Sequence, residues 1–171
     1  MQEQSLTALL EAMLLAAGRP VTVKELAAAG DLSEHDTKLA LAELERNINQ
    51  SRRGIVLRPV AGGMQFFIRA EYKPYIQRLL QPAEKPRLSQ AALETLAIIA
   101  YCQPITRLKI EQIRGVQVDS VLTTLQERDL ITVVGRKDGP GRPILYGTTD
   151  NFLQSVGLNS LNDLPQQNLP E

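Results

Sequence analysis

Residues 135–149 read GRKDGPGRPILYGTT and join two short apolar runs, at 130–134 and 144–146. Glycine and proline interrupt the stretch between the runs, and this pattern predicts a β-hairpin with a long connecting loop. The loop carries three basic side chains, Arg136, Lys137 and Arg142. Such a hairpin serves one of two purposes: its basic tip contacts nucleic acid, or its strands help to form a protein-binding surface.

Shifting the sequence against itself by 84 residues reveals a weak internal repeat. Residues 15–22 (LAAGRPVT) then lie over residues 99–106 (IAYCQPIT), and apolar positions on either side coincide as well. The order of helix and turn signals is the same in both halves. The sequence therefore predicts two copies of one structural unit.

Each copy is expected to contain three helices followed by a hairpin. The expected N-caps are Ser5, Thr22, Ser33, Ser89 and Thr106. Thr22 has Glu25 three residues later, which is the spacing of a capping box. Thr106 has Lys109 at the corresponding place, so the second copy is predicted to have a weaker cap than the first.

Three helices followed by a hairpin are typical of a winged-helix domain. We therefore expect a mainly α protein with small β-hairpins, an α+β fold of two tandem winged-helix domains joined by a short Pro-containing linker. The expected parts are an N-terminal domain at 1–80, the linker at 81–87, a C-terminal domain at 88–164 and a flexible tail at 165–171.

The composition is that of an ordinary globular chain. Its 171 residues include 19 basic and 19 acidic side chains, and a net charge of zero argues against broad attraction to nucleic acid or anionic lipid. The apolar run at 12–17 is too short to span a bilayer, and no signal peptide is recognisable, so a cytoplasmic location is expected. A single cysteine, Cys102, excludes a disulfide within the chain.

The sequence offers little for enzymatic chemistry. The one histidine, His35, stands between two acidic residues at an expected exposed helix start, and nothing nominates an oriented partner for it. Cys102 is expected to be a buried structural thiol. No phosphate-binding loop motif is present. We expect no catalytic, cofactor-binding or metal-binding residue, no cofactor and no enzymatic activity.

Binding of DNA is the serious alternative, since winged helices often place their third helix in the major groove. The third helix of the first copy, near 33–46, carries four acidic residues against two basic ones. That of the second copy, near 119–128, has Arg128 as its only basic residue. An excess of carboxylates does not suit an anionic groove. The basic turns support only weak, salt-sensitive contact, and plain solvation explains them equally well.

Several motifs of the second copy belong together. Residues 88–116 contain LSQAALETLAIIAY, QPITR and IRGV, and the hairpin follows the pattern G-R-x-x-x-P-G-R-P-x-x-Y-x-T-T. Residues 157–165 add GLNSLNDLP. Together these motifs closely resemble the bacterial segregation and condensation protein B (ScpB) family. Cys102 and Lys109 depart from the family pattern, and the first copy matches by order of signals more than by motif.

The resemblance implies a non-enzymatic subunit of a condensin-like complex. Proteins of this family dimerise, chiefly through the N-terminal winged helix, and bind the central segment of the kleisin segregation and condensation protein A (ScpA). That kleisin bridges the ATPase heads of the SMC protein, and the assembly condenses and partitions chromosomes during cell division. The implied partners are a second copy, ScpA and, through ScpA, SMC. Association with the nucleoid, weak or indirect contact with DNA and no contact with membrane are implied as well.

A kleisin segment requires an apolar groove with a polar rim. We expect this groove on the C-terminal copy, between its first helix and the hairpin. Its expected lining residues are Tyr101, Arg107, Arg136, Lys137, Arg142 and Tyr146. The expected dimer contacts are Leu6, Met13, Met64 and Phe66, which are equally suited to the core. The alternative function is that of a stand-alone winged-helix DNA-binding transcription regulator.

Overall fold

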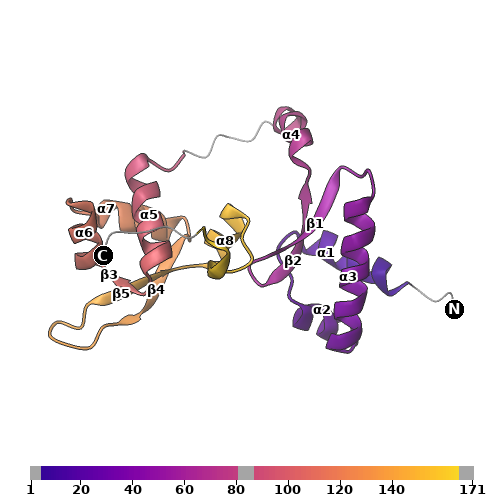
Figure 1. Ribbon diagram of the computed structural model, residues 1–171, viewed down its shortest axis with the longest axis horizontal. Helices are drawn as coiled ribbons and strands as arrows, with labels where there is room; N and C mark the ends of the chain where they lie inside the picture. The colour runs from indigo at the N-terminus through magenta and orange to yellow at the C-terminus, as the bar shows by residue number, and fades with distance from the viewer. Residues whose placement is uncertain (1–4, 81–86, 166–171) are drawn as a thin grey trace. The chain divides into compact units, whose positions relative to one another are not determined.

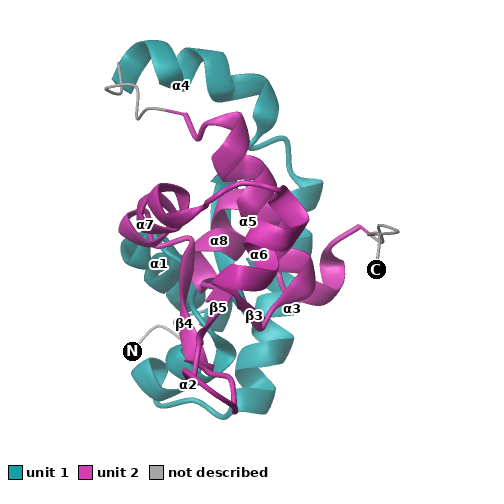
Figure 2. Cartoon of the chain, turned by 90° about the vertical axis from the view of Figure 1, so that its left-hand side faces the viewer, with its two compact units in different colours: residues 1–83 teal, residues 84–171 magenta. Residues whose placement is uncertain are grey.

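The computed structural model describes residues 5–80 and 87–165 (Figure 1). The chain divides into two compact units, Met1–Ala83 and Glu84–Glu171, which Figure 2 shows in teal and magenta. Each unit has its own hydrophobic core and is described by itself. The expected linker and tail lie outside the described residues, apart from Arg87 and Pro165.

Unit 1 consists of helices and one hairpin. Its elements are α1 (Leu6–Ala17), α2 (Val23–Gly30), α3 (Glu34–Gln50), β1 (Ile55–Val60), β2 (Gly63–Ile68), a 3₁₀ turn (Ala70–Tyr72) and α4 (Lys73–Leu80). Leu41, Leu44 and Ile48 of α3 are buried and pack in the core with Leu10 and Leu14 of α1. In contrast, α4 has no buried residue.

A capping box fixes the start of α2. Glu25 accepts a hydrogen bond from the Thr22 main-chain N–H (2.8 Å), and the Thr22 hydroxyl accepts one from the Glu25 N–H (3.2 Å). The Thr22 hydroxyl (2.8 Å) and the Arg19 guanidinium (2.9 Å) also donate to the same carboxylate. These bonds, led by the one from the Thr22 main chain, favour the charged form and lower the pKa of Glu25 from 4.5 to about 2.

The hairpin of unit 1 turns in two residues. Val60 pairs with Gly63, so Ala61 and Gly62 alone form the turn. Both turn residues have positive φ, 48° and 71°, as a type I′ turn requires. This turn type matches the right-handed twist of the two strands.

A short main-chain pairing ties this hairpin to the helices. The Val21 N–H donates to the Met64 carbonyl (3.0 Å), and the Met64 N–H donates to the Val21 carbonyl (2.9 Å). The two backbones approach so closely that a Cβ atom on Gly63 would lie 2.8 Å from Val21 main-chain atoms. Position 63 therefore requires glycine.

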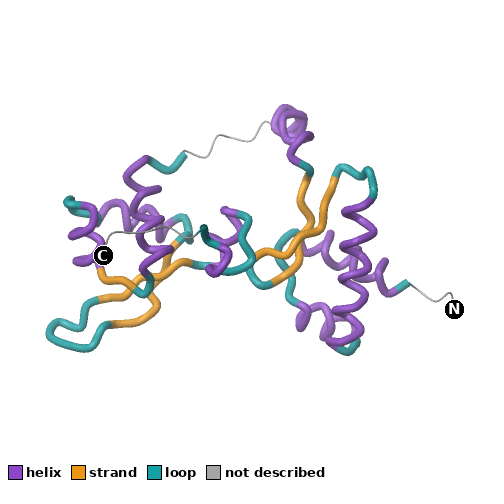
Figure 3. The backbone as a smooth tube through the Cα atoms, in the orientation of Figure 1, coloured by secondary structure: helices purple, strands orange, loops and turns teal. Residues whose placement is uncertain are grey.

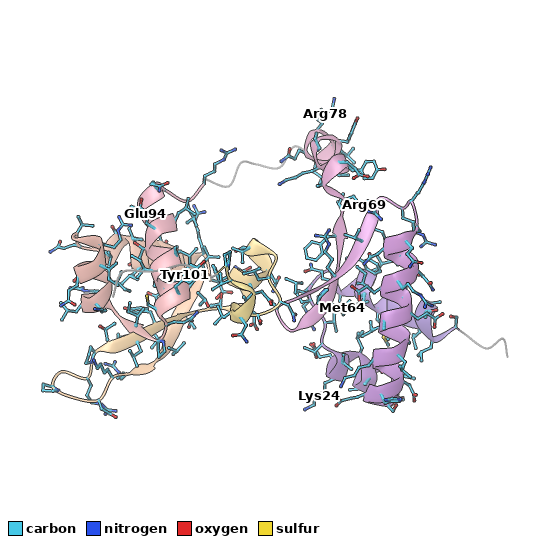
Figure 4. The ribbon with its side chains drawn as sticks, in the orientation of Figure 1. Lys24, Met64, Arg69, Arg78, Glu94 and Tyr101 are labelled. Atoms are coloured by element: carbon cyan, nitrogen blue, oxygen red, sulfur yellow. The ribbon has the colours of Figure 1, made fainter. Side chains whose placement is uncertain are left out.

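Arg69, which directly follows β2, closes the end of α3 (Figure 4). Its guanidinium donates to the main-chain carbonyls of Asn49 (3.2 Å), Ser51 (3.1 Å) and Arg53 (2.7 Å). The Asn49 side chain in turn pairs with both the N–H and the carbonyl of Leu57 (2.9 Å each). A helix C-terminus leaves its last carbonyls without internal partners. Arg69 satisfies that of Asn49 and holds the two carbonyls that follow the helix, while the Asn49 side chain joins α3 to the hairpin.

Unit 2 combines helices with a three-stranded sheet. Its elements are α5 (Gln90–Cys102), β3 (Ile105–Thr106), α6 (Arg107–Arg114), α7 (Asp119–Glu127), β4 (Ile131–Arg136), β5 (Ile144–Thr148), α8 (Asp150–Val156) and a 3₁₀ turn (Leu161–Asp163). The sheet is antiparallel, in the order β3–β5–β4. Helical residues such as Ile99, Ile110 and Leu125 form the core with Ile131 of the sheet.

The offset of 84 residues relates elements of the two units. It carries the start of α1 onto the start of α5 and the start of α2 onto the start of α6. It also carries Val21, which pairs with Met64, onto Ile105, which pairs with Tyr146. The sequence does not predict β3, since two residues are too short to show alternation. Helices with small antiparallel hairpins are confirmed as the fold class.

Four of the five predicted N-caps are confirmed. The side chains of Thr22, Ser33, Ser89 and Thr106 each accept a hydrogen bond from the N–H three residues on. The prediction for Ser5 is wrong in one respect, because this residue precedes α1 but makes no capping bond. Its hydroxyl pairs with that of Thr7 instead (2.6 Å).

The capping box makes the stability of unit 1 depend on pH in a defined window. Because the pKa of Glu25 is lower in the folded chain than its ordinary 4.5, the stabilisation by its charge is complete above pH 4.5 and is lost as pH falls toward 2. We expect Glu25→Gln to be less stable than the parent at pH 7 and the difference to shrink below pH 4.5. Urea unfolding followed by circular dichroism measures this. A difference independent of pH contradicts the assignment.

Candidate functional site

The hairpin of unit 2 forms as the sequence predicts (Figure 3). Strands β4 and β5 pair antiparallel, with Val134 as an extra, bulged residue in β4. The Lys137 N–H extends the pairing by donating to the Pro143 carbonyl (2.9 Å). This bond lies at the base of the connecting loop, and it holds the main chain of Lys137 in place.

The tip of this hairpin is folded on itself. Arg142 has a positive φ of 37°, and its N–H donates to the Gly139 carbonyl (3.2 Å). The Arg136 guanidinium donates to the Arg142 carbonyl from the opposite strand (3.1 Å). Arg136 is thus partly engaged in holding the loop, whereas the side chains of Lys137 and Arg142 are exposed.

Gln103 clasps the hairpin to the end of α5. Its side-chain oxygen accepts a hydrogen bond from the Thr148 N–H (2.7 Å), and its amide donates to the Thr148 hydroxyl (2.9 Å) and to the Ala100 carbonyl (3.1 Å). A Cβ atom at Gly147 would lie 2.9 Å from the same side-chain oxygen and 2.8 Å from Val134. Glycine at 147 therefore leaves the space that the clasp occupies.

A groove of about 390 Å³ opens between the end of α5, α6 and the hairpin, and we call it the lysine groove. Its apolar lining consists of Cys102, Pro104, Ile105, Ile113 and Leu145. Its polar lining consists of Thr106, Lys109 and Lys137. The lysine groove lies in the region where the sequence predicts a groove, between the first helix of the second copy and the hairpin.

Of the six predicted groove residues, only Lys137 lines the lysine groove. Arg107 is turned to other partners, since its guanidinium pairs with Asp119 and with Glu111 (3.4 Å). The hydroxyl of Tyr101, a residue labelled in Figure 4, donates to the Pro165 carbonyl (2.9 Å). Tyr146 packs against the core. Arg136 and Arg142 belong to the hairpin tip described above.

The sequence prediction missed Lys109 and Cys102 as groove residues. Both are departures from the family pattern. A signal for Lys109 was nevertheless present, because the repeat aligns it with Glu25, and a lysine there interrupts a capping box. Cys102 carried no comparable signal, and the fold alone brings it half-buried to the edge of the groove.

A second groove of unit 2 is larger and more apolar, at about 770 Å³. Leu88 and Leu93 both line it, together with residues from the ends of α7 and α8. Leu93 is 48% exposed. The charged residues that line this second groove are Glu127, Arg128 and Asp129, so its rim carries both signs of charge.

The four predicted dimer residues of unit 1 have an intermediate position. Leu6, Met13, Met64 and Phe66 are all partly buried and pack against the core. Larger apolar exposure is found on α4 and just before it, where Tyr72, Tyr75, Leu79 and Leu80 are exposed. The structure of a single chain leaves the dimer contacts as a prediction.

Within residues 5–80 and 87–165, no group of three or more histidine, cysteine, aspartate or glutamate side chains is arranged to hold a metal ion. Over the same residues, no helix combines the length and the apolar character needed to cross a membrane. The surface features of unit 2 described above are its grooves and its basic hairpin.

These features define a class of protein: a chain of two helix-and-hairpin units, the second of which has grooves and a basic hairpin. The family model described as "Segregation and condensation complex subunit ScpB" matches residues 8–167. The chain belongs to this family.

Relatives of the same name are similar over most of the chain. The segregation and condensation protein B of Symbiobacterium thermophilum is 52% identical over 157 residues, which cover 92% of this chain and 71% of that protein. The protein of that name from Moorella thermoacetica is 52% identical over 161 residues, covering 94% and 82%. A crystal structure of a dimer of the ScpB N-terminal domain complexed with ScpA peptide is 30% identical, covers 47% of this chain and 96% of that chain, and has a TM-score of 0.43.

The clasp predicts that Gln103 stabilises unit 2. Gln103→Ala leaves the half-buried Thr148 N–H without its acceptor, and we expect a loss of about 1–3 kcal/mol in the free energy of unfolding. The control is Gln90→Ala, which removes only an exposed bond to Glu94 and should cost less than about 0.5 kcal/mol. Urea unfolding measures both, and equal losses would show that the clasp contributes nothing special.

Proposed function

We propose that this chain is the ScpB subunit of a condensin-like SMC–kleisin complex that condenses and partitions chromosomes. The match of the family over residues 8–167 carries the proposal. In this role the chain catalyses no reaction of its own. It pairs with a second copy and binds ScpA, and through ScpA it meets the SMC ATPase at the nucleoid, in the cytoplasm.

The proposal includes two tandem winged-helix domains, at 1–80 and 88–164. Three observations support it. In both units three helices precede an antiparallel hairpin. In both, the residue just before the capping threonine of the second helix pairs with the second hairpin strand. In both, a threonine caps that second helix.

We assign dimerisation to the N-terminal domain and kleisin binding to the C-terminal domain. The partly buried positions of Leu6, Met13, Met64 and Phe66 leave each of them some surface for a second copy. The lysine groove and the basic hairpin supply the C-terminal domain with a surface for ScpA. In the solved complex of another ScpB, the N-terminal domain is complexed with an ScpA peptide. Binding of ScpA is therefore to be tested for each unit separately.

Co-purification with ScpA from the same organism, followed by mass measurement of the complex, tests the proposal as a whole. A complex that contains two copies of this chain and ScpA supports it. Failure of the two purified proteins to associate contradicts it.

Charge reversal on the hairpin should weaken the binding of ScpA. We expect Arg136→Glu with Arg142→Glu to lower affinity about tenfold or more, because both are exposed positive charges on the hairpin of the unit to which we assign kleisin binding, and reversing them opposes an electrostatically complementary partner. The control is Arg52→Glu with Arg58→Glu, which reverses two exposed charges of unit 1. Isothermal titration calorimetry measures both. A loss confined to the control would move the site to unit 1.

Removal of residues 1–80 should abolish the dimer. Unit 2 has a core of its own and should persist as a monomer, because the proposed dimer contacts lie in the part removed. Sedimentation equilibrium measures the mass of the truncated and complete chains. A truncated chain that remains dimeric would show that the contacts lie in unit 2.

A further inference from the structure

The two copies place opposite charges at equivalent helix positions. Glu25 and Lys109 are each the third residue after the capping threonine of their helix. In α2, Glu25 completes the capping box. In α6, the Thr106 hydroxyl accepts a hydrogen bond from the Lys109 N–H (3.3 Å). Lysine has no carboxylate to accept the reciprocal bond from the Thr106 N–H. A cation in the first turn also opposes the helix dipole. Lysine at 109 is therefore a locally unfavourable choice.

The side chain that breaks the box faces the lysine groove. Lys109 and Ile113 are four residues apart on α6, so they share one helix face, and both line the groove. Lys137 lines it from the hairpin. The charged groups of this groove are thus two lysines held on different elements.

Neither lysine has an acidic ion-pair partner among residues 5–80 and 87–165. None of the residues that line the groove carries a carboxylate. The nearby Arg107 shows the contrast, since Glu111 and Asp119 both pair with it. Two unpaired positive charges beside an apolar lining call for a ligand with negative charge and apolar surface together.

We propose that the lysine groove receives a segment of ScpA in which carboxylate side chains stand beside apolar ones. This deepens the function proposed above and rests on it. Ile113, which is 43% exposed, and half-buried Leu145 meet the apolar side chains. Lys109 and Lys137 bind the carboxylates from two sides and set which stretch of ScpA enters. The other groove of unit 2 has a rim of mixed charge and selects no such ligand.

A peptide fits this groove better than nucleic acid does. Five of its eight lining residues are apolar or a thiol, and a phosphate backbone has no apolar group to fill that part. The third helix of unit 2, α7, also brings Asp119 and Glu127 rather than basic residues. Charge complementarity therefore favours an acidic polypeptide.

The unfavourable placement of Lys109 gives a test in which stability and binding move in opposite directions. Lys109→Glu supplies the carboxylate that a capping box requires, so we expect the thermal midpoint of the full-length chain to rise by about 2–4 °C. The same change should weaken the binding of purified ScpA from the same organism about tenfold or more. Lys137→Glu should weaken binding similarly and leave the midpoint unchanged.

Lys24→Glu is the matched control. It reverses an exposed lysine in the first turn of α2, the equivalent helix of unit 1 (Figure 4), and should leave ScpA affinity unchanged. Unchanged affinity in both groove variants, while the parent binds ScpA, overturns the inference and leaves the proposed function standing. Failure of the parent itself to bind ScpA overturns both.

The single cysteine reports on the groove directly. Cys102 lines it, so bound ScpA should slow the alkylation of the full-length chain by iodoacetamide. Overlapping peptides that tile the ScpA sequence locate the protecting segment. We expect this peptide to lose its effect when its carboxylates are changed to amides.

Two outcomes of the alkylation experiment overturn the inference. One is saturation with ScpA that leaves the alkylation rate of Cys102 unchanged, since the segment then binds elsewhere. The other is protection by a short DNA duplex without protection by any ScpA peptide, since the groove then serves nucleic acid.

Discussion

Both units depend on one main-chain constraint: the residue just before the capping threonine of the second helix pairs with the second strand of the hairpin. Val21 meets Met64 in unit 1, and Ile105 meets Tyr146 in unit 2. The following threonine caps the helix, so strand pairing and helix start are fixed within two residues. The pairing therefore ties the second helix of each unit to its hairpin. The approach is close enough in unit 1 to require glycine at 63.

On this shared frame the two units use their polar groups differently. Unit 1 satisfies its charges locally, as in the capping box around Glu25 and the closure of α3 by Arg69. In unit 2 the helix α6 has no capping box, because Lys109 occupies the position of the acidic residue, and Lys109 and Lys137 line an apolar groove. Natural chains often depart from the locally best residue where a surface serves a partner. The difference between the copies is therefore more informative about function than their similarity.

Local signals predicted most of the elements, and long-range contacts account for what they missed. The caps at Thr22, Ser33, Ser89 and Thr106 were readable because a cap depends on residues within one turn. Arg107 was expected at the groove, but Asp119, twelve residues later, draws its guanidinium away. The pairing of Gly63 is likewise visible only in the strand register.

The sequence by itself determined the repeat, the helix starts, the basic hairpin and the resemblance to the ScpB family. All of these depend on the spacing of residues along the chain, which the sequence contains directly. Only the tertiary structure decided which side chains share the lysine groove. Cys102, Lys109 and Lys137 come from three elements, and their meeting depends on the Gln103 clasp and the pairing of Ile105 with Tyr146. Such contacts follow from packing between elements, which no local pattern encodes.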